Sequence, residues 1–304
     1  MAAIAGTTDR APLWRRILSW VLLILFCLLA PLGLITGWAH ALVFNTDRYV
    51  ATVDQLATNT DIQDAASTAV TNAILDRYGP ALGAQFLRPR VESAVHDVIS
   101  SSQFATFWST ANRAAHAEIV ALIRGRDQSG ALSTRDGQVV LDLAPIVQAV
   151  ETRLQDSGVD LSSVPVSSPR TTEFVLVDSA DLASAKRVTR IFDDVGFGVP
   201  IAAVVALVLT ILVAVDRRRA LFRAGVGLAL AMALLLVLLL VARSRYLDAF
   251  ATGVRHDAAA AVFDIVLRRL VIAAVVLLAV GLVTAVASLL VHRGRSAGAS
   301  PAIP

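Results

Sequence analysis

Four long apolar segments without a charged side chain constrain what this chain can fold into. Each contains 19–22 residues, and they comprise residues 17–38, 195–215, 224–242 and 270–291. About 20 apolar residues in an α-helix cross the ~30 Å hydrocarbon core of a bilayer, where a helix satisfies its own backbone hydrogen bonds. The chain is 56% hydrophobic with a mean hydropathy of +0.67, values typical of membrane proteins. We therefore predict a mainly α-helical membrane protein with four transmembrane helices.

A domain-sized segment, residues 39–194, separates the first two apolar segments. Apolar residues at helical spacing predict helices that begin near Thr46, Thr60, Pro89 and Ser102, with Gly79-Pro80 ending the second. Alternating patterns predict short strands over residues 131–134, 138–143 and 173–178. The only cysteine, Cys27, lies in the first apolar segment, so a hydrophobic core rather than a disulfide must stabilise this domain. We expect an extracytoplasmic, mostly helical α+β domain.

Arginines flank the apolar segments on one side of the membrane. They occur in the N-terminal tail (1–16), the link 216–223 and the C-terminal tail (292–304). Because positively charged flanks remain in the cytoplasm, we predict a multi-pass plasma-membrane protein with both termini and this link cytoplasmic. Residues 39–194 and a short helical loop, 243–269, then lie outside. Arginines in that loop weaken the rule, although Asp248, Asp257 and Asp264 offset part of their charge.

The net charge of +3 is unevenly distributed along the chain. Residues 39–194 contain 19 acidic and 13 basic side chains, a net charge of −6, so the positive charge belongs to the flanks of the spans. The arginines do not form a basic stripe interleaved with aromatic residues, which is the pattern of nucleic-acid binding. We therefore expect the lipid bilayer, and not a nucleic acid, as a partner.

The apolar segments contain no ionisable residue, which argues against a self-contained ion-coupled transporter. Small residues recur in them at a spacing of four. Gly33 and Gly37 form a GxxxG pair, which lets helices approach closely and predicts a helix-packing face. The abundance of alanine and glycine is the alternative explanation.

Two further groups of residues are candidates for a role beyond folding. Gly196, Gly198 and Pro200 lie where the outer domain meets the second apolar segment, so they predict either a hinge or a simple break between domain and membrane. The basic loop residues bind either anionic lipid or a cytoplasmic partner, or they only set the topology; they are Arg217, Arg218, Arg219 and Arg223.

No motif of a catalytic or metal site occurs in the sequence. There is no G-x-S-x-G, no P-loop and no H-E-x-x-H. The histidines are scattered and are interpreted as solvated or capping residues; they are His40, His96, His116, His256 and His292. We predict no enzymatic activity, no cofactor and no metal. The pairs Arg48-Tyr49 and Arg245-Tyr246 hint at an internal repeat of residues 48–75 in 245–267, with coincidence as the alternative.

Four segments carry a resemblance to a known group of proteins. They read NTDRYVATV (45–53), DGQVVLDLAP (136–145), EFVLVDSADL (173–182) and DRRRALFRAG (216–225). The chain resembles integral membrane proteins of high-GC Gram-positive (actinobacterial) bacteria that carry no assigned activity. This resemblance implies a plasma-membrane protein with an exported domain, and it supplies no catalytic residues. The order of spans and loops is also similar to that of the permease subunit of the cell-division ABC complex.

These patterns lead to two functional expectations. The first is a non-enzymatic scaffold or accessory subunit whose outer domain binds a cell-envelope protein or a second copy of the chain. The alternative is a permease-like subunit of a multi-protein complex that handles lipid or apolar cargo. An enzyme acting on envelope polymers would instead need a cluster of Asp, Glu or His side chains in the outer domain.

Overall fold

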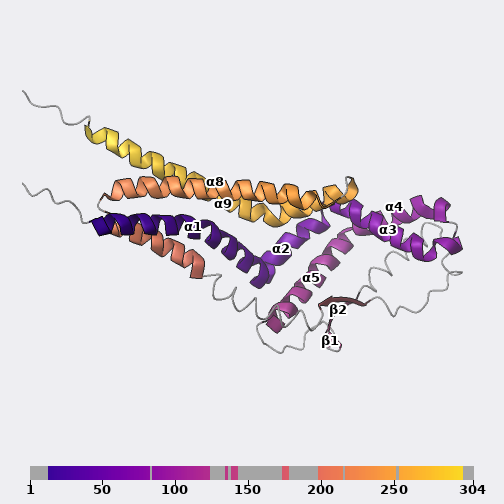
Figure 1. Cartoon of the computed structure of the whole chain (residues 1–304). Helices are drawn as coiled ribbons and strands as arrows, with labels where there is room; N and C mark the ends of the chain where they lie inside the picture. Colours follow the sequence, from indigo (N-terminus) through magenta and orange to yellow (C-terminus); the bar gives the residue numbers. More distant parts are fainter. Residues whose placement is uncertain are drawn as a thin grey trace, which may run out of the picture. The chain divides into compact units, whose positions relative to one another are not determined.

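The computed structural model describes residues 13–82, 84–123, 134–135, 138–142, 173–177, 198–214, 216–250 and 253–296. Its helices and strands are α1 (Leu13–Phe44), α2 (Thr46–Ala57), α3 (Thr60–Leu82), α4 (Ala84–Ile99), α5 (Ser102–Ile123), β1 (Thr134–Arg135), β2 (Gln138–Asp142), β3 (Glu173–Val177), an apolar helix Gly198–Val213, α8 (Arg217–Leu247) and α9 (Val254–Ser296) (Figure 1). The chain divides into two compact units. Unit 1 comprises residues 1–39, 193–241 and 269–304, and unit 2 comprises residues 40–192 and 242–268.

Three described helices are long and apolar enough to cross a membrane: α1, α8 and α9. The prediction of four spans is therefore wrong. The remaining apolar helix, Gly198–Val213, falls short of the 18 residues that a candidate span requires. Its described part, Gly198–Val213, covers about 24 Å at ~1.5 Å per residue, against the ~30 Å hydrocarbon core.

The long helices of unit 1 pack in a defined direction. Trp20 and Cys27 of α1 lie against Arg223 and Gly227 of α8, so these two helices run parallel. Gly225 of α8 lies against Gly281 of α9, while Met232 clusters with Ala274, so α9 runs the opposite way. Met232 and Ala274 are fully buried, whereas residues on other faces of the same helices are exposed, as expected for surfaces that contact lipid.

The helix Gly198–Val213 lies beside α1 and runs opposite to it. Pro200 contacts Gly33 near the middle of α1, and Ala206 shares a core cluster with Leu23 and Phe26 further toward its N-terminus. The chain thereby returns to the end of unit 1 at which α1 begins. Asp216 then starts α8, because its Oδ1 accepts the backbone N–H groups of Arg218 and Arg219 at 3.1 and 3.2 Å.

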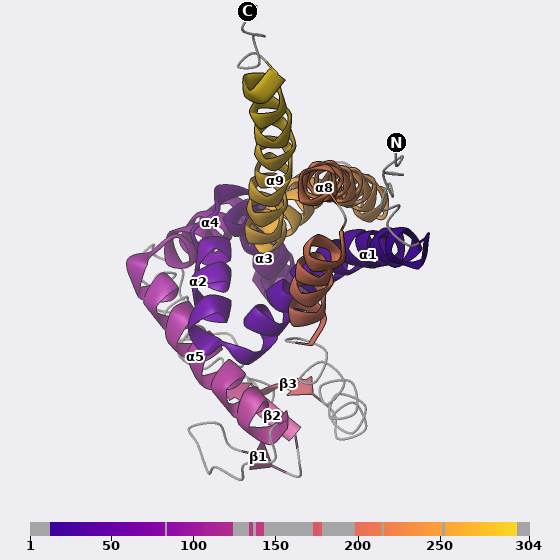
Figure 2. The ribbon, with the colours of Figure 1, turned by 90° about the vertical axis from the view of Figure 1, so that its left-hand side faces the viewer.

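In unit 2, α2–α5 pack against one another, with α5 beside α2 (Figure 2). Side-chain caps define where three of these helices begin. Asn45, Asn59 and Ser101 accept the backbone N–H groups of Arg48, Ile62 and Phe104 at 3.0, 3.1 and 3.1 Å. The best-defined core lies between α3 and α4 and comprises Leu75, Val91, Ala94, Val95, Val98 and Ile99.

The expected α+β domain is also corrected by the structure. Helices dominate the described part of residues 39–194 and carry its described core. The strands β1, β2 and β3 have only two, five and five residues. β2 and β3 lie within the predicted strands, whereas β1 overlaps the predicted 131–134 only at Thr134. They form one antiparallel sheet in the order β1-β2-β3, with Val140 opposite Val175. The alternating pattern thus located β2 and β3 but overstated the share of strands in the fold.

Two predicted helix boundaries were wrong as well. α3 continues through Gly79-Pro80 to Leu82, and α4 begins at Ala84. Pro89 therefore lies inside α4 rather than in its first turn. Proline and glycine weaken a helix locally, but the α3–α4 core on either side keeps these segments helical.

Candidate functional site

The junction between α1 and α2 is the most highly organised polar region among the described residues. Asn45 separates the two helices and adopts an extended conformation, with φ −113° and ψ 101°. Its side chain caps α2 through the N–H of Arg48. The end of α1 and the start of α2 both belong to unit 2, so the junction lies wholly within that unit.

His116 of α5 fills the junction. It is only 8% exposed, and its Nδ1 lies 3.1 Å from Oγ1 of Thr46. Its ring stacks on Tyr49 with the centroids 4.1 Å apart. Burial lowers the pKa of His116, while backbone hydrogen bonds with Leu42 and Val43 act in the opposite direction. A single neutral side chain thus connects the end of α1, the start of α2 and α5.

Further hydrogen bonds join α2 to α5 beyond the histidine. Tyr49 Oη donates to Asn112 Oδ1 at 3.2 Å, and Trp108 Nε1 donates to the carbonyl of Val53 at 3.0 Å. Ser109 donates to Oδ2 of Asp54 at 3.2 Å. Partly buried bonds of this kind fix the relative position of two helices more firmly than exposed ion pairs do. These contacts join α2 and α5 along several turns within unit 2.

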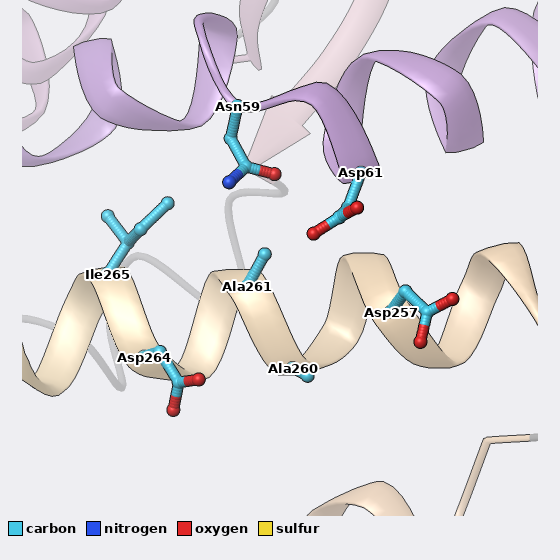
Figure 3. A pocket seen from close by; sticks show the side chains of 7 residues that line it. All are labelled: Asn59, Asp61, Asp257, Ala260, Ala261, Asp264 and Ile265. Carbon is cyan, nitrogen blue, oxygen red and sulfur yellow. The ribbon is translucent and has the colours of Figure 1, made fainter.

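An acidic hollow of about 480 Å³ lies elsewhere in unit 2 (Figure 3). Its lining residues are Asn59, Asp61, Asp257, Ala260, Ala261, Asp264 and Ile265. Figure 3 shows Asp61 projecting from α3 toward α9. Two polar residues that line the hollow already have partners. Asn59 caps α3, and Asp264 accepts two hydrogen bonds from Arg243 at 2.8 and 2.9 Å. Within the described ranges, no group of three or more His, Cys, Asp or Glu residues could hold a metal ion.

Of the residues singled out from the sequence, Gly33 lies at the closest approach of α1 to the helix Gly198–Val213. A Cβ on Gly33 would lie 3.0 Å from Cα of Pro200, whereas one on Gly37 would make an ordinary contact of 3.9 Å with its ring. Gly196 lies outside the described residues. Gly198 is the first described residue of this helix, and Pro200 lies two residues further along it.

The predicted basic loop is helical. Arg217, Arg218 and Arg219 form the first turn of α8, and Arg223 lies one turn later with its guanidinium over the ring of Trp20. The notable close approach between α8 and α9 had not been predicted. It joins Gly225 and Gly281, where an added Cβ would lie 2.6–2.7 Å from a backbone oxygen of the other helix.

The interpretation of His116 as a solvated or capping residue was wrong. Its position could have been inferred, because Trp108, Asn112 and His116 follow one another at a spacing of four on α5 and therefore share one face. Among the other histidines, His96 is half-exposed, with Nδ1 3.6 Å from Asp64.

Comparisons with known proteins identify no relative. No family model, no curated protein and no solved structure matches the chain. The fold therefore defines its class. Three long apolar helices with exposed apolar faces make it a multi-pass membrane protein.

Proposed function

We propose that the protein is a non-enzymatic scaffold or accessory subunit of the plasma membrane. In this proposal the helices α2–α5, which we call the lobe, face the outside of the cell and bind a protein of the cell envelope. The resemblance to membrane proteins of actinobacteria is part of the proposal and supports an exported lobe.

The observation that carries this proposal is the junction at His116. A lobe that merely filled space between spans would need no organised connection to α1. Instead, His116 of α5 forms hydrogen bonds with the backbone at the end of α1 and contacts Thr46 and Tyr49 of α2. Contacts of this kind keep α2 and α5 together within unit 2, and a pre-organised surface lowers the entropic cost of binding a partner.

The distribution of arginine supports the proposed orientation. α1 and α8 both begin at the same end of unit 1, and α9 ends there. Arginines flank all three helix ends, and the proposal places this end in the cytoplasm with both chain termini. In this orientation the lobe is the surface that we propose for the partner.

Close packing in unit 1 favours this proposal over the permease-like alternative. Met232 and Ala274 are fully buried, and Gly225 and Gly281 bring the backbones of α8 and α9 together. A pathway for apolar cargo between these two helices would have to separate that contact.

Photo-crosslinking in living cells tests the proposed function. A photoreactive residue replaces Val70, which is 38% exposed on α3, or Leu234, a matched apolar position that is 61% exposed on α8. The proposal predicts one discrete protein adduct from position 70 and only lipid adducts from position 234. Lobe positions that yield no protein adduct, when Glu92 on α4 is tested as well, would contradict it.

A further inference from the structure

A cluster of basic side chains lies where α1 and α8 begin in unit 1. Cζ of Arg223 lies 4.8 Å from the ring centroid of Trp20, within the range of a cation–π contact. Residues four apart share a helix face, so Arg16 and Arg219 lie one turn earlier on the faces that carry Trp20 and Arg223. We call Arg16, Trp20, Arg219 and Arg223 the arginine clamp.

The positive charge of the clamp is only partly neutralised. Asp216 Oδ2 lies 3.2 Å from Nε of Arg219, and its other oxygen caps α8, so one carboxylate faces four arginines over residues 216–223. Arg16, Arg219 and Arg223 are exposed, and Arg219 is 77% exposed at its side chain. The clamp is thus open to an anionic ligand.

The neighbouring residues place the clamp at the edge of the apolar surface. Ile17 and Val21 of α1 are 65% and 55% exposed, as expected of side chains in contact with acyl chains. Trp14 and Trp20 are 61% and 49% exposed and flank this position, which is where tryptophan concentrates in membrane proteins. A ligand at this level therefore meets guanidinium groups on one side and hydrocarbon on the other.

We propose that the arginine clamp binds the phosphate headgroup of an anionic phospholipid, such as phosphatidylglycerol. Guanidinium groups bind phosphate oxygens with two parallel hydrogen bonds. The ring of Trp20 holds one of them in place before the lipid arrives, and the exposed apolar side chains below contact its acyl chains. The site requires neither the proposed partner of the lobe nor a particular orientation of the protein.

Lipid binding by the purified full-length protein tests this proposal. In zwitterionic detergent, phosphatidylglycerol should raise the melting temperature more than phosphatidylcholine does, and native mass spectrometry should show it retained. The double variant Arg16→Gln/Arg223→Gln should bind it about tenfold or more weakly, since each arginine near a membrane surface contributes roughly fivefold. The control, Arg255→Gln/Arg268→Gln, removes the same charge at two exposed positions of α9 and should bind like the unaltered protein.

Several results would overturn the proposal. They are equal binding of the two lipids by the unaltered protein, undiminished binding by the clamp variant, or an equal loss in the control. Stabilisation by inorganic phosphate alone would show that a free anion, and not a lipid, is the ligand. If the clamp variant does not fold, the salt dependence of the unaltered protein still tests the proposal. Its preference for phosphatidylglycerol must weaken between 50 and 500 mM salt, because the screening length falls to about 4 Å.

Discussion

At the scale of single residues, His116 is the side chain that connects α1, α2 and α5 at the junction. This buried, neutral side chain of α5 forms backbone hydrogen bonds at the end of α1. It also contacts Thr46 and Tyr49 of α2. Buried polar groups contribute most when every neighbour has a partner, and removing one leaves the others unsatisfied. The histidine is therefore expected to be more important for stability than the half-exposed His96.

The first prediction concerns the variant His116→Ala. It should lower the free energy of unfolding by about 2 kcal/mol, because it removes packing against Tyr49 and leaves Thr46 without its partner. Chemical denaturation in detergent, followed by the fluorescence of Trp108 in a background with the other tryptophans replaced, measures the change. His96→Ala is the matched control and should change stability by less than about 0.5 kcal/mol. Equal effects of the two variants would contradict the role assigned to the junction.

The second prediction is a pH dependence. Because the pKa of His116 is lowered in the folded protein, the unfolded chain binds a proton more readily. The contribution of the neutral ring is fully present above the unfolded pKa of about 6.5 and is lost as the pH falls through the folded value. Melting temperatures measured from pH 8 to pH 5 should fall less steeply for His116→Phe than for the unaltered protein. Identical slopes would contradict the prediction.

At the scale of helices and strands, close contacts between backbones determine how unit 1 assembles. Gly225 and Gly281 meet with no room for a side chain, since an added Cβ would lie 2.6–2.7 Å from backbone oxygen. Membrane helices lack a hydrophobic force that drives them together, so van der Waals contact of this kind supplies much of their association energy.

The third prediction follows from that contact. Gly225→Ala should destabilise the protein by about 1–3 kcal/mol, because the added methyl group must force two backbones apart. Gly37→Ala is the control, since its Cβ would lie 3.9 Å from the ring of Pro200 and should be tolerated. Thermal unfolding in one detergent compares the two variants. A control as unstable as Gly225→Ala would mean that helix propensity, and not the close contact, explains the loss.

The sequence predicted the elements better than their assembly. Helical periodicity located α2, α3 and α5, and alternation located β2 and β3 but not β1. The sequence did not show that α8 starts at Arg217. A run of arginines indicates a loop unless Asp216 is recognised as the N-cap of a helix. Nor did it show that Gly225, rather than another glycine of the apolar segments, meets α9. That choice depends on how two helices cross, which a single sequence does not contain.

For the candidate site too, the sequence indicated the residues better than the contacts between helices. The arginines of α8 were identified from composition, but their contact with Trp20 is between helices. His116 was misinterpreted because a histidine carries no apolar signal, although its spacing from Trp108 placed it on the packed face of α5. The count of four spans was wrong, since three of the described helices are long and apolar enough to cross a membrane.

At the scale of the whole molecule, the proposed function depends on which side of the membrane the lobe faces. The distribution of arginine favours a cytoplasmic position for the ends of α1, α8 and α9 that carry these residues. Under the proposal the lobe then faces the outside of the cell, where it binds an envelope partner. If the orientation is reversed, the lobe meets cytoplasmic proteins instead, and the proposed function has to be abandoned.

Labelling of cysteines in intact cells measures this orientation most directly. In a Cys27→Ala background, Thr106→Cys reports on α5 and Arg217→Cys on the start of α8, and both positions are exposed. The account predicts that a membrane-impermeant maleimide labels position 106 in intact cells and position 217 only after the cells are permeabilised. Labelling of position 217 in intact cells, with position 106 protected until permeabilisation, would contradict it.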